Sequence, residues 1–134
     1  EAIYKKYDDD FPLENIYNER IDYFFNLLAE DFSELRNSFM MKSYVVHSLF
    51  CAITALKFGF PGSDELENEL GFTANPNFDV NPSRVIPILL EMADAHEIQD
   101  EDGPYAAYVT SCLSSTTKLP QRTTRTKELI KAFL

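Results

Sequence analysis

Apolar residues along most of this chain recur every three or four positions, which is the spacing of one face of an α-helix. The pattern predicts four long helices, which span about Pro12 to Ala29, Phe39 to Phe60, Pro82 to Glu97 and Pro120 to Leu134. A shorter stripe over residues 105–113, with side chains at i, i+3, i+4, i+7 and i+8, predicts one more helix.

Short polar segments and helix breakers separate these elements. Asp10 is expected to cap the first helix, and residues 31–36 suit a short helical turn. Gly59 and the following Pro61-Gly62 end the longest apolar stretch. Ser63, which precedes a run of acids, predicts a short capped helix before a loop over residues 71–81. Pro87 is expected to kink its helix unless it falls in the first turn.

These patterns predict an all-α fold. No segment alternates between apolar and polar residues as a half-buried strand does. The stretch from Phe39 to Phe60 is apolar nearly all round, which is typical of a helix covered by neighbours on every side. We therefore expect a polar segment over residues 1–10, followed over residues 11–134 by a single compact bundle of about five helices with a buried central helix.

Composition narrows the functional classes. The chain has 134 residues and a formal net charge of −10, which disfavours broad electrostatic binding to nucleic acid. Two cysteines do not form a disulfide framework, so a cytoplasmic protein is expected. No apolar run approaches the roughly 20 residues of a membrane span, so no membrane partner is expected. The first residue is Glu1 rather than Met, which suggests a fragment of a larger protein.

Candidate catalytic and metal-binding residues are few. His47 and Cys51 share a helix face at i, i+4, a spacing that can hold zinc, but their apolar helix favours two core residues without metal. Cys112 could act as a nucleophile only beside a base such as His96, which is expected on the solvent side of an acidic helix end. The sequence contains no phosphate-loop, GxGxxG, HExxH or GxSxG motif. We expect no catalytic residue, no cofactor and no metal.

The C-terminal segment departs from the acidic character of the chain. Residues 111–134 contain five Lys or Arg and one Glu, a balance of +4 against −14 for the rest. A helix start rich in hydroxyls and cations can bind an anion or a partner. The candidate residues for that contact are Ser114, Ser115, Thr116, Thr117, Lys118, Arg122 and Arg125. The alternative, which we favour, is a capped, exposed connection followed by a helix whose Lys and Arg side chains pair with carboxylates of the acidic body.

Two stretches, FMMKSYVVHSLFCAITALKFGFPG and YAAYVTSCLSSTTKLPQRTTRTKELI, together resemble the C-terminal helical region of the GmrSD-type restriction family, domain of unknown function 262. The resemblance rests on features at Ser48–Ala52, Phe58–Gly62, Tyr105–Val109, Ser114–Thr117 and Arg122–Arg125, and covers about the last hundred residues. It implies a parent that is a nucleotide-dependent restriction endonuclease acting on foreign DNA. The D-G-Q-x-R motif of that family's ParB-like catalytic domain is missing here, so no catalytic residue is carried over.

Two functions follow as hypotheses. The first is a non-catalytic interaction or scaffold domain of a phage-defence protein. It packs on the missing N-terminal domain of the same parent and contacts DNA weakly or indirectly through the region of Arg122 and Arg125. The alternative is a stand-alone acidic binding protein, such as a DNA mimic or an enzyme inhibitor, which would carry a continuous acidic face.

Overall fold

The computed structural model describes the backbone of residues 11–134 and the side chains from Asn18 onward. The expected polar segment over residues 1–10 and the Asp10 cap lie outside the described residues. The described part contains six α-helices, two 3-10 turns and no strand, so the all-α prediction is confirmed and the count of five helices is wrong. The elements are α2 (Phe11–Ala29), η1 (Ser33–Leu35), η2 (Phe39–Met41), α3 (Ser43–Lys57), α4 (Ser63–Leu70), α5 (Pro82–Glu97), α6 (Ala106–Leu113) and α7 (Leu119–Phe133).

The long apolar stretch is not one helix, contrary to the sequence prediction. Ser38 caps the turn η2 by accepting a hydrogen bond from the amide of Met40 at 3.1 Å. The backbone of Lys42 then extends, with ψ 138°, before α3 begins. An extended residue between two helical segments breaks the repeating hydrogen bonds, whatever the hydrophobicity of its neighbours. The break places Ser43 and Tyr44 at a helix start.

A tight turn joins α3 to α4. Gly62 has φ 91°, a left-handed conformation that glycine adopts without steric cost. Ser63 is the first residue of α4, and its hydroxyl accepts a hydrogen bond from the amide of Phe60 at 2.9 Å. This side chain therefore closes the turn and does not cap the helix as predicted. The helix α5 continues through Pro87, which lies inside it rather than in its first turn.

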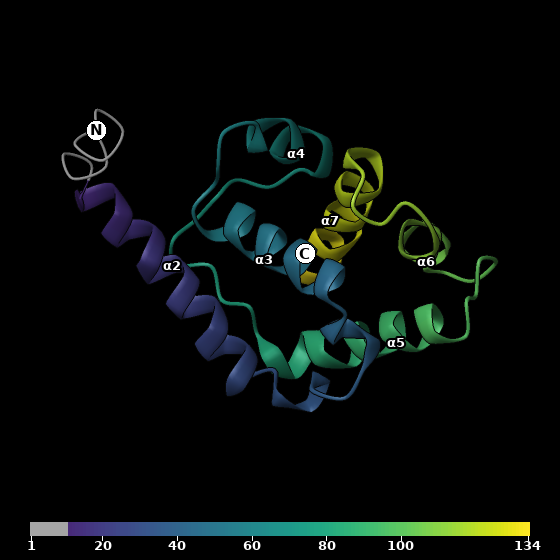
Figure 1. Cartoon of the computed structure of the whole chain (residues 1–134). Coiled ribbons are helices and arrows are strands. Elements are labelled where there is room, and N and C mark those ends of the chain that lie inside the picture. Colours follow the sequence, from purple (N-terminus) through teal and green to yellow (C-terminus); the bar gives the residue numbers. More distant parts are fainter. Residues whose placement is uncertain (1–10) are drawn as a thin grey trace, which may run out of the picture.

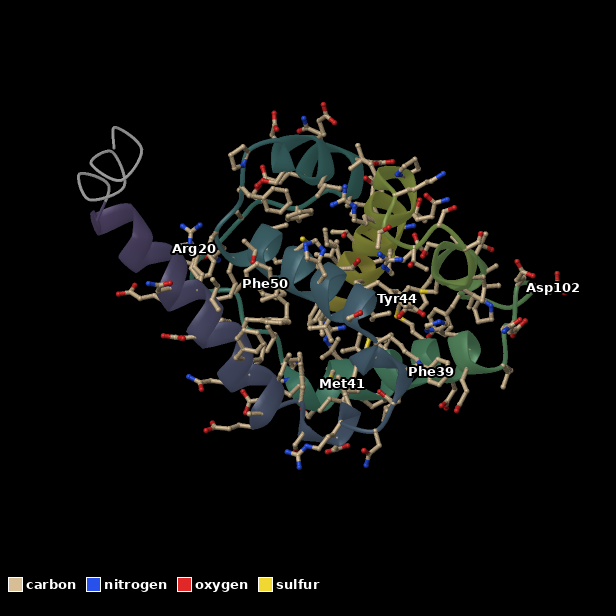
Figure 2. All side chains as sticks on the ribbon, viewed as in Figure 1. Arg20, Phe39, Met41, Tyr44, Phe50 and Asp102 are labelled. Carbon is tan, nitrogen blue, oxygen red and sulfur yellow. The ribbon has the colours of Figure 1, made fainter. Side chains whose placement is uncertain are left out.

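Helices α3 and α7 pack against each other, and α6 packs on α7 (Figure 1). The core includes Leu49 and Ile53 of α3 and Leu129 and Phe133 of α7. Every other helix that the structure describes also contributes buried apolar residues to the core. The side chains in Figure 2 fill the space that the ribbons enclose. Helix α2 lies along one edge of the molecule (Figure 1). Part of its apolar surface is exposed. Within residues 11–134, no helix combines the length and apolar character needed to cross a membrane.

Candidate functional site

The most unusual side chain is Arg125, a charged residue with only 1% of its surface exposed. Its Nε donates to the hydroxyl of Ser48 at 2.8 Å. One terminal nitrogen donates to the carbonyl of Ser111 at 2.9 Å, and the other to the carbonyl of Thr116 at 2.8 Å. The guanidinium also lies 5.2 Å from the ring centroid of Tyr44. Arg125 thus connects α7 to α3, to α6 and to the loop between α6 and α7.

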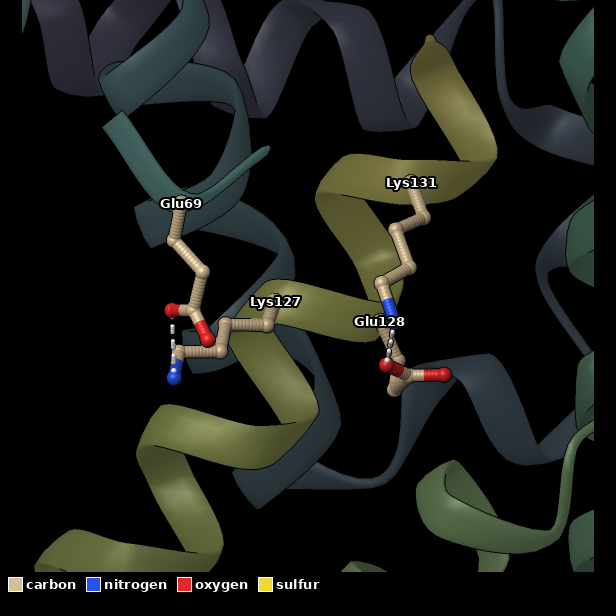
Figure 3. A network of polar contacts seen from close by, with 4 residues as sticks. All are labelled: Glu69, Lys127, Glu128 and Lys131. Carbon is tan, nitrogen blue, oxygen red and sulfur yellow. Dashed lines mark hydrogen bonds and ion pairs between the residues drawn. The ribbon is translucent and has the colours of Figure 1, made fainter. Parts of the chain in front are cut away.

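The partners of Arg125 are neutral oxygens. Within the described residues, the ion pairs are Lys127–Glu69 and Lys131–Glu128, each at 2.7 Å, and neither involves Arg125 or Arg122 (Figure 3). The expected pairing with carboxylates is therefore wrong for these two arginines in that part of the chain, whereas Lys127 of the same segment does pair with Glu69. The reason is local: Ser111 lies in the last turn of α6, where carbonyl groups lack helical donors and carry the negative end of the helix dipole. The guanidinium of Arg125 donates hydrogen bonds to such carbonyl groups, so it needs no carboxylate as a partner.

A pocket of about 490 Å³ opens beside this network. It lies where the start of α3 meets the first half of α7 and the preceding loop. None of its seven described lining residues is acidic: they are Ser43, Tyr44, His47, Thr116, Thr117, Arg122 and Arg125. All seven can donate a hydrogen bond from the side chain. A pocket of this composition suits an anion.

A second pocket of about 450 Å³ adjoins the first and shares His47 and Arg122 with it. Its lining also contains Glu65 and Glu69 of α4. Glu69 pairs with Lys127 there, as Figure 3 shows. The carboxylates make this neighbour less suited to an anion, so the acid-free pocket is the stronger candidate.

The sequence-predicted anion contacts do not all meet at one place. Ser114, Ser115 and Lys118 are exposed and line none of the pockets described here. Thr116, Thr117, Arg122 and Arg125 do come together, in the acid-free pocket. Most of the loop is solvent-exposed, as predicted, and α7 starts at Leu119, just before the predicted start at Pro120. Arg125, however, is a buried structural group, while Arg122 is exposed.

Sequence reasoning missed the contribution of α3. Ser43, Tyr44 and His47 reach the pocket only because η2 ends before Lys42 and a new helix begins. One signal was present: Tyr44, His47 and Ser48 carry hydrogen-bonding side chains and fall at i, i+3 and i+4 within the largely apolar stretch. That spacing indicates a shared face, although not what the face meets.

The prediction that His47 is a core residue is wrong, because His47 is exposed. Cys51, one turn later, is half-buried. Burial raises the pKa of the Cys51 thiol, and the charge of Arg122 partly opposes that shift. In the described part of the chain no group of three or more His, Cys, Asp or Glu side chains is arranged to hold a metal ion. That these residues bind no metal stays a prediction.

The expectation that His96 faces solvent is also wrong, since only 3% of it is exposed. Its Nε2 lies 3.1 Å from the hydroxyl of Tyr44, and the rings of Phe39 and Tyr108 meet it edge to face. Tyr44, at the start of α3, and Phe39, in η2, are labelled in Figure 2. Burial lowers the pKa of His96, and the charges of Lys42 and Arg125 lower it further. A helix end of acidic sequence can still turn its histidine inward when aromatic neighbours enclose it.

Cys112 lies in the buried interior, 3.9 Å from the hydroxyl of Ser111. Burial raises the pKa of its thiol, although the hydrogen bond between Ser111 and Cys112 and the charge of Arg125 oppose the shift. A thiolate, not a thiol, is the nucleophile in cysteine catalysis. The surroundings therefore favour a packing role for Cys112.

Comparison with protein families, with curated proteins and with solved structures finds no match to this chain. The resemblance to the GmrSD-type restriction family accordingly rests on the sequence features alone.

Proposed function

We propose that this chain is a non-catalytic helical interaction domain of a GmrSD-type DNA restriction protein, and that it packs against the N-terminal domain of the same parent. The proposal treats residues 11–134 as one compact bundle built around α3, located in the cytoplasm. The observation that carries it is an exposed apolar surface on α2, the helix at the edge of the molecule (Figure 1).

That surface is made by side chains one helical turn apart. Phe25 is 59% exposed and Ile21 is 40% exposed, so both project from one side of α2. Ile21 also lines an apolar groove of about 310 Å³ between α2 and α3, together with Phe50 and Phe60. Singly scattered surface apolar residues are ordinary, whereas contiguous exposed apolar surface marks interaction sites, and this pair adjoins an apolar groove.

The family assignment is tested by the gene. The reading frame upstream of the codon for Glu1 should continue and encode a ParB-like domain with a D-G-Q-x-R motif. An upstream frame that is open but lacks this motif would contradict the family, and a start codon at that point would favour the stand-alone acidic binding protein.

The docking surface is tested by substitution. The encoded upstream domain, expressed separately, should bind this chain, and the double variant Ile21→Ser/Phe25→Ser should weaken that binding at least about tenfold, since burying each apolar side chain is worth about 1.5–3 kcal/mol. Ile98→Ser is the matched control, because Ile98 is 73% exposed at the end of α5. Equal binding by the double variant and the wild type would place the interface elsewhere.

A further inference from the structure

We propose that the acid-free pocket between α3 and α7 binds a single phosphate group of a small phosphorylated molecule. This inference is independent of the proposed docking surface on α2, because the two share no residue. The pocket residues come from three segments that are distant in sequence: the start of α3, the loop after α6, and α7. A bound phosphate would connect all three.

The side chains that line the pocket are of the types that donate hydrogen bonds to a phosphate. Arg122 and Arg125 supply guanidinium N–H groups, which pair with phosphate oxygens in a fixed fork geometry. Ser43, Thr116 and Thr117 add hydroxyl donors, and the ring of His47 adds an N–H in either tautomer. The phosphate oxygens would thus be met by groups that can all donate.

The position of α3 adds to this attraction. The helix begins at Ser43, no side chain caps its first amide groups, and Ser43 and Tyr44 both line the pocket. The first turn of a helix carries free N–H groups and the positive end of the dipole, which favours an anion. The α3 start therefore strengthens a site that the side chains of α7 already define.

Charge balance gives a further reason. Arg125 is nearly fully buried, and no ion pair links it to a carboxylate in the described part of the chain. Its three protein hydrogen bonds go to neutral oxygens, so its positive charge is solvated without being neutralised. A phosphate in the adjoining pocket would supply the missing negative charge. Arg125 is held rigidly by these bonds, so it would meet the ligand without reorganisation.

The same charges favour a small ligand over duplex DNA. The chain carries a net charge of −10, and the neighbouring pocket contains Glu65 and Glu69. A long polyanion lying across this face would meet those carboxylates, whereas one phosphate group would contact only the donors. The pocket volume of about 490 Å³ falls within the usual range for small-molecule sites.

Isothermal titration calorimetry of the full chain tests the proposal. The probes are inorganic phosphate, adenosine 5′-monophosphate, adenosine and a 20-base-pair DNA duplex without terminal phosphate groups. We expect phosphate and the monophosphate to bind once per chain, and adenosine and the duplex to show no binding. If inorganic phosphate and adenosine 5′-monophosphate bind with equal affinity, the phosphate group alone is recognised. If the nucleotide binds more tightly, the base or sugar adds contacts. No heat with either phosphorylated probe would overturn the proposal.

Arg122→Gln should weaken phosphate binding at least about tenfold, because it removes one charge-assisted donor set from an exposed, non-structural position. Arg36→Gln is the matched control. Arg36 is also exposed, directly follows the last residue of η1 and lines none of the pockets described here. An equal loss in both variants would indicate general charge attraction and refute a defined site. Binding of the duplex without either phosphorylated probe would instead identify a nucleic-acid contact, and binding of adenosine a nucleoside pocket.

Discussion

Replacing Arg125 should destabilise the fold more than any other single substitution of a basic residue that the structure describes. Arg125→Ala removes three hydrogen bonds and leaves the carbonyls of Ser111 and Thr116 without their donor. A hydrogen bond to a charged group contributes about 1.5–3 kcal/mol, and leaving a buried acceptor unsatisfied costs about 1–3 kcal/mol. These contributions overlap, and removing a buried charge returns part of its desolvation cost.

The net loss should be about 3–5 kcal/mol, the range seen when one partner of a buried charged network is removed. That is a large share of the roughly 5–15 kcal/mol that stabilises a typical domain. For a chain of 134 residues it corresponds to a fall in Tm of roughly 10–20 °C. Arg125→Lys keeps the charge but cannot place donors in three directions, so it should fall between Ala and the wild type.

Urea denaturation followed by far-UV circular dichroism measures these free energies of unfolding. Arg122→Ala is the matched control, because Arg122 lies three residues earlier on the same helix but is exposed. It should change the free energy by less than about 0.5 kcal/mol. The reasoning fails if Arg125→Ala unfolds within 0.5 kcal/mol of the wild type, or if Arg122→Ala costs as much.

Three further predictions concern pH, metal content and catalysis. Burial lowers the pKa of His96 from its ordinary 6.5, so as the pH falls the unfolded state takes up this proton before the folded state does. The free energy of unfolding should therefore fall as the pH drops below 6.5, and His96→Phe should flatten that slope in denaturation curves measured from pH 7.5 to 5. Protein purified without chelator should contain no stoichiometric zinc by elemental analysis, because His47 and Cys51 supply two ligands where zinc takes four; a one-to-one content lost in Cys51→Ser would contradict this. The chain alone should show no nuclease or nucleotide hydrolysis in turnover assays, and activity abolished by one carboxylate substitution would refute that.

The sequence predicts helices well in this chain because their signals are local. The bounds of α5 match the prediction from Pro82 to Glu97, where a proline starts the helix and the apolar spacing continues throughout. The break at Lys42 could not be predicted, because it depends on a backbone dihedral, and polar residues such as Lys42 and Ser43 also occur inside helices. The hydrophobic period indicates which residues share a helix face, but it does not show where the backbone leaves the helical conformation.

Burial of polar residues was harder to predict for a different reason. The acidic neighbours of His96 in sequence predict exposure to solvent, yet its environment is set by Phe39, Tyr44 and Tyr108, which come from other elements. The apolar residues around His47 predict a core position, yet His47 is exposed on α3. In both cases the neighbours along the chain do not indicate the neighbours in space. Only four of the seven lining residues of the acid-free pocket, the Thr and Arg residues of one continuous stretch, could be found that way.

The two arginines of that stretch explain why an acidic chain keeps a basic segment before its last apolar residues. Arg122 and Arg125 are three positions apart, which places them about 60° from each other around a helix. One can therefore point into the core while the other remains at the surface, and both still reach the same pocket. Arg125 satisfies the end of α6 and fixes the loop, so replacing it should cost stability. Arg122 has no such structural contact among the described residues, and its charge is available to a ligand. Substitution at the two positions should therefore separate stability from binding, which is why Arg122 is the residue to change when the pocket is tested.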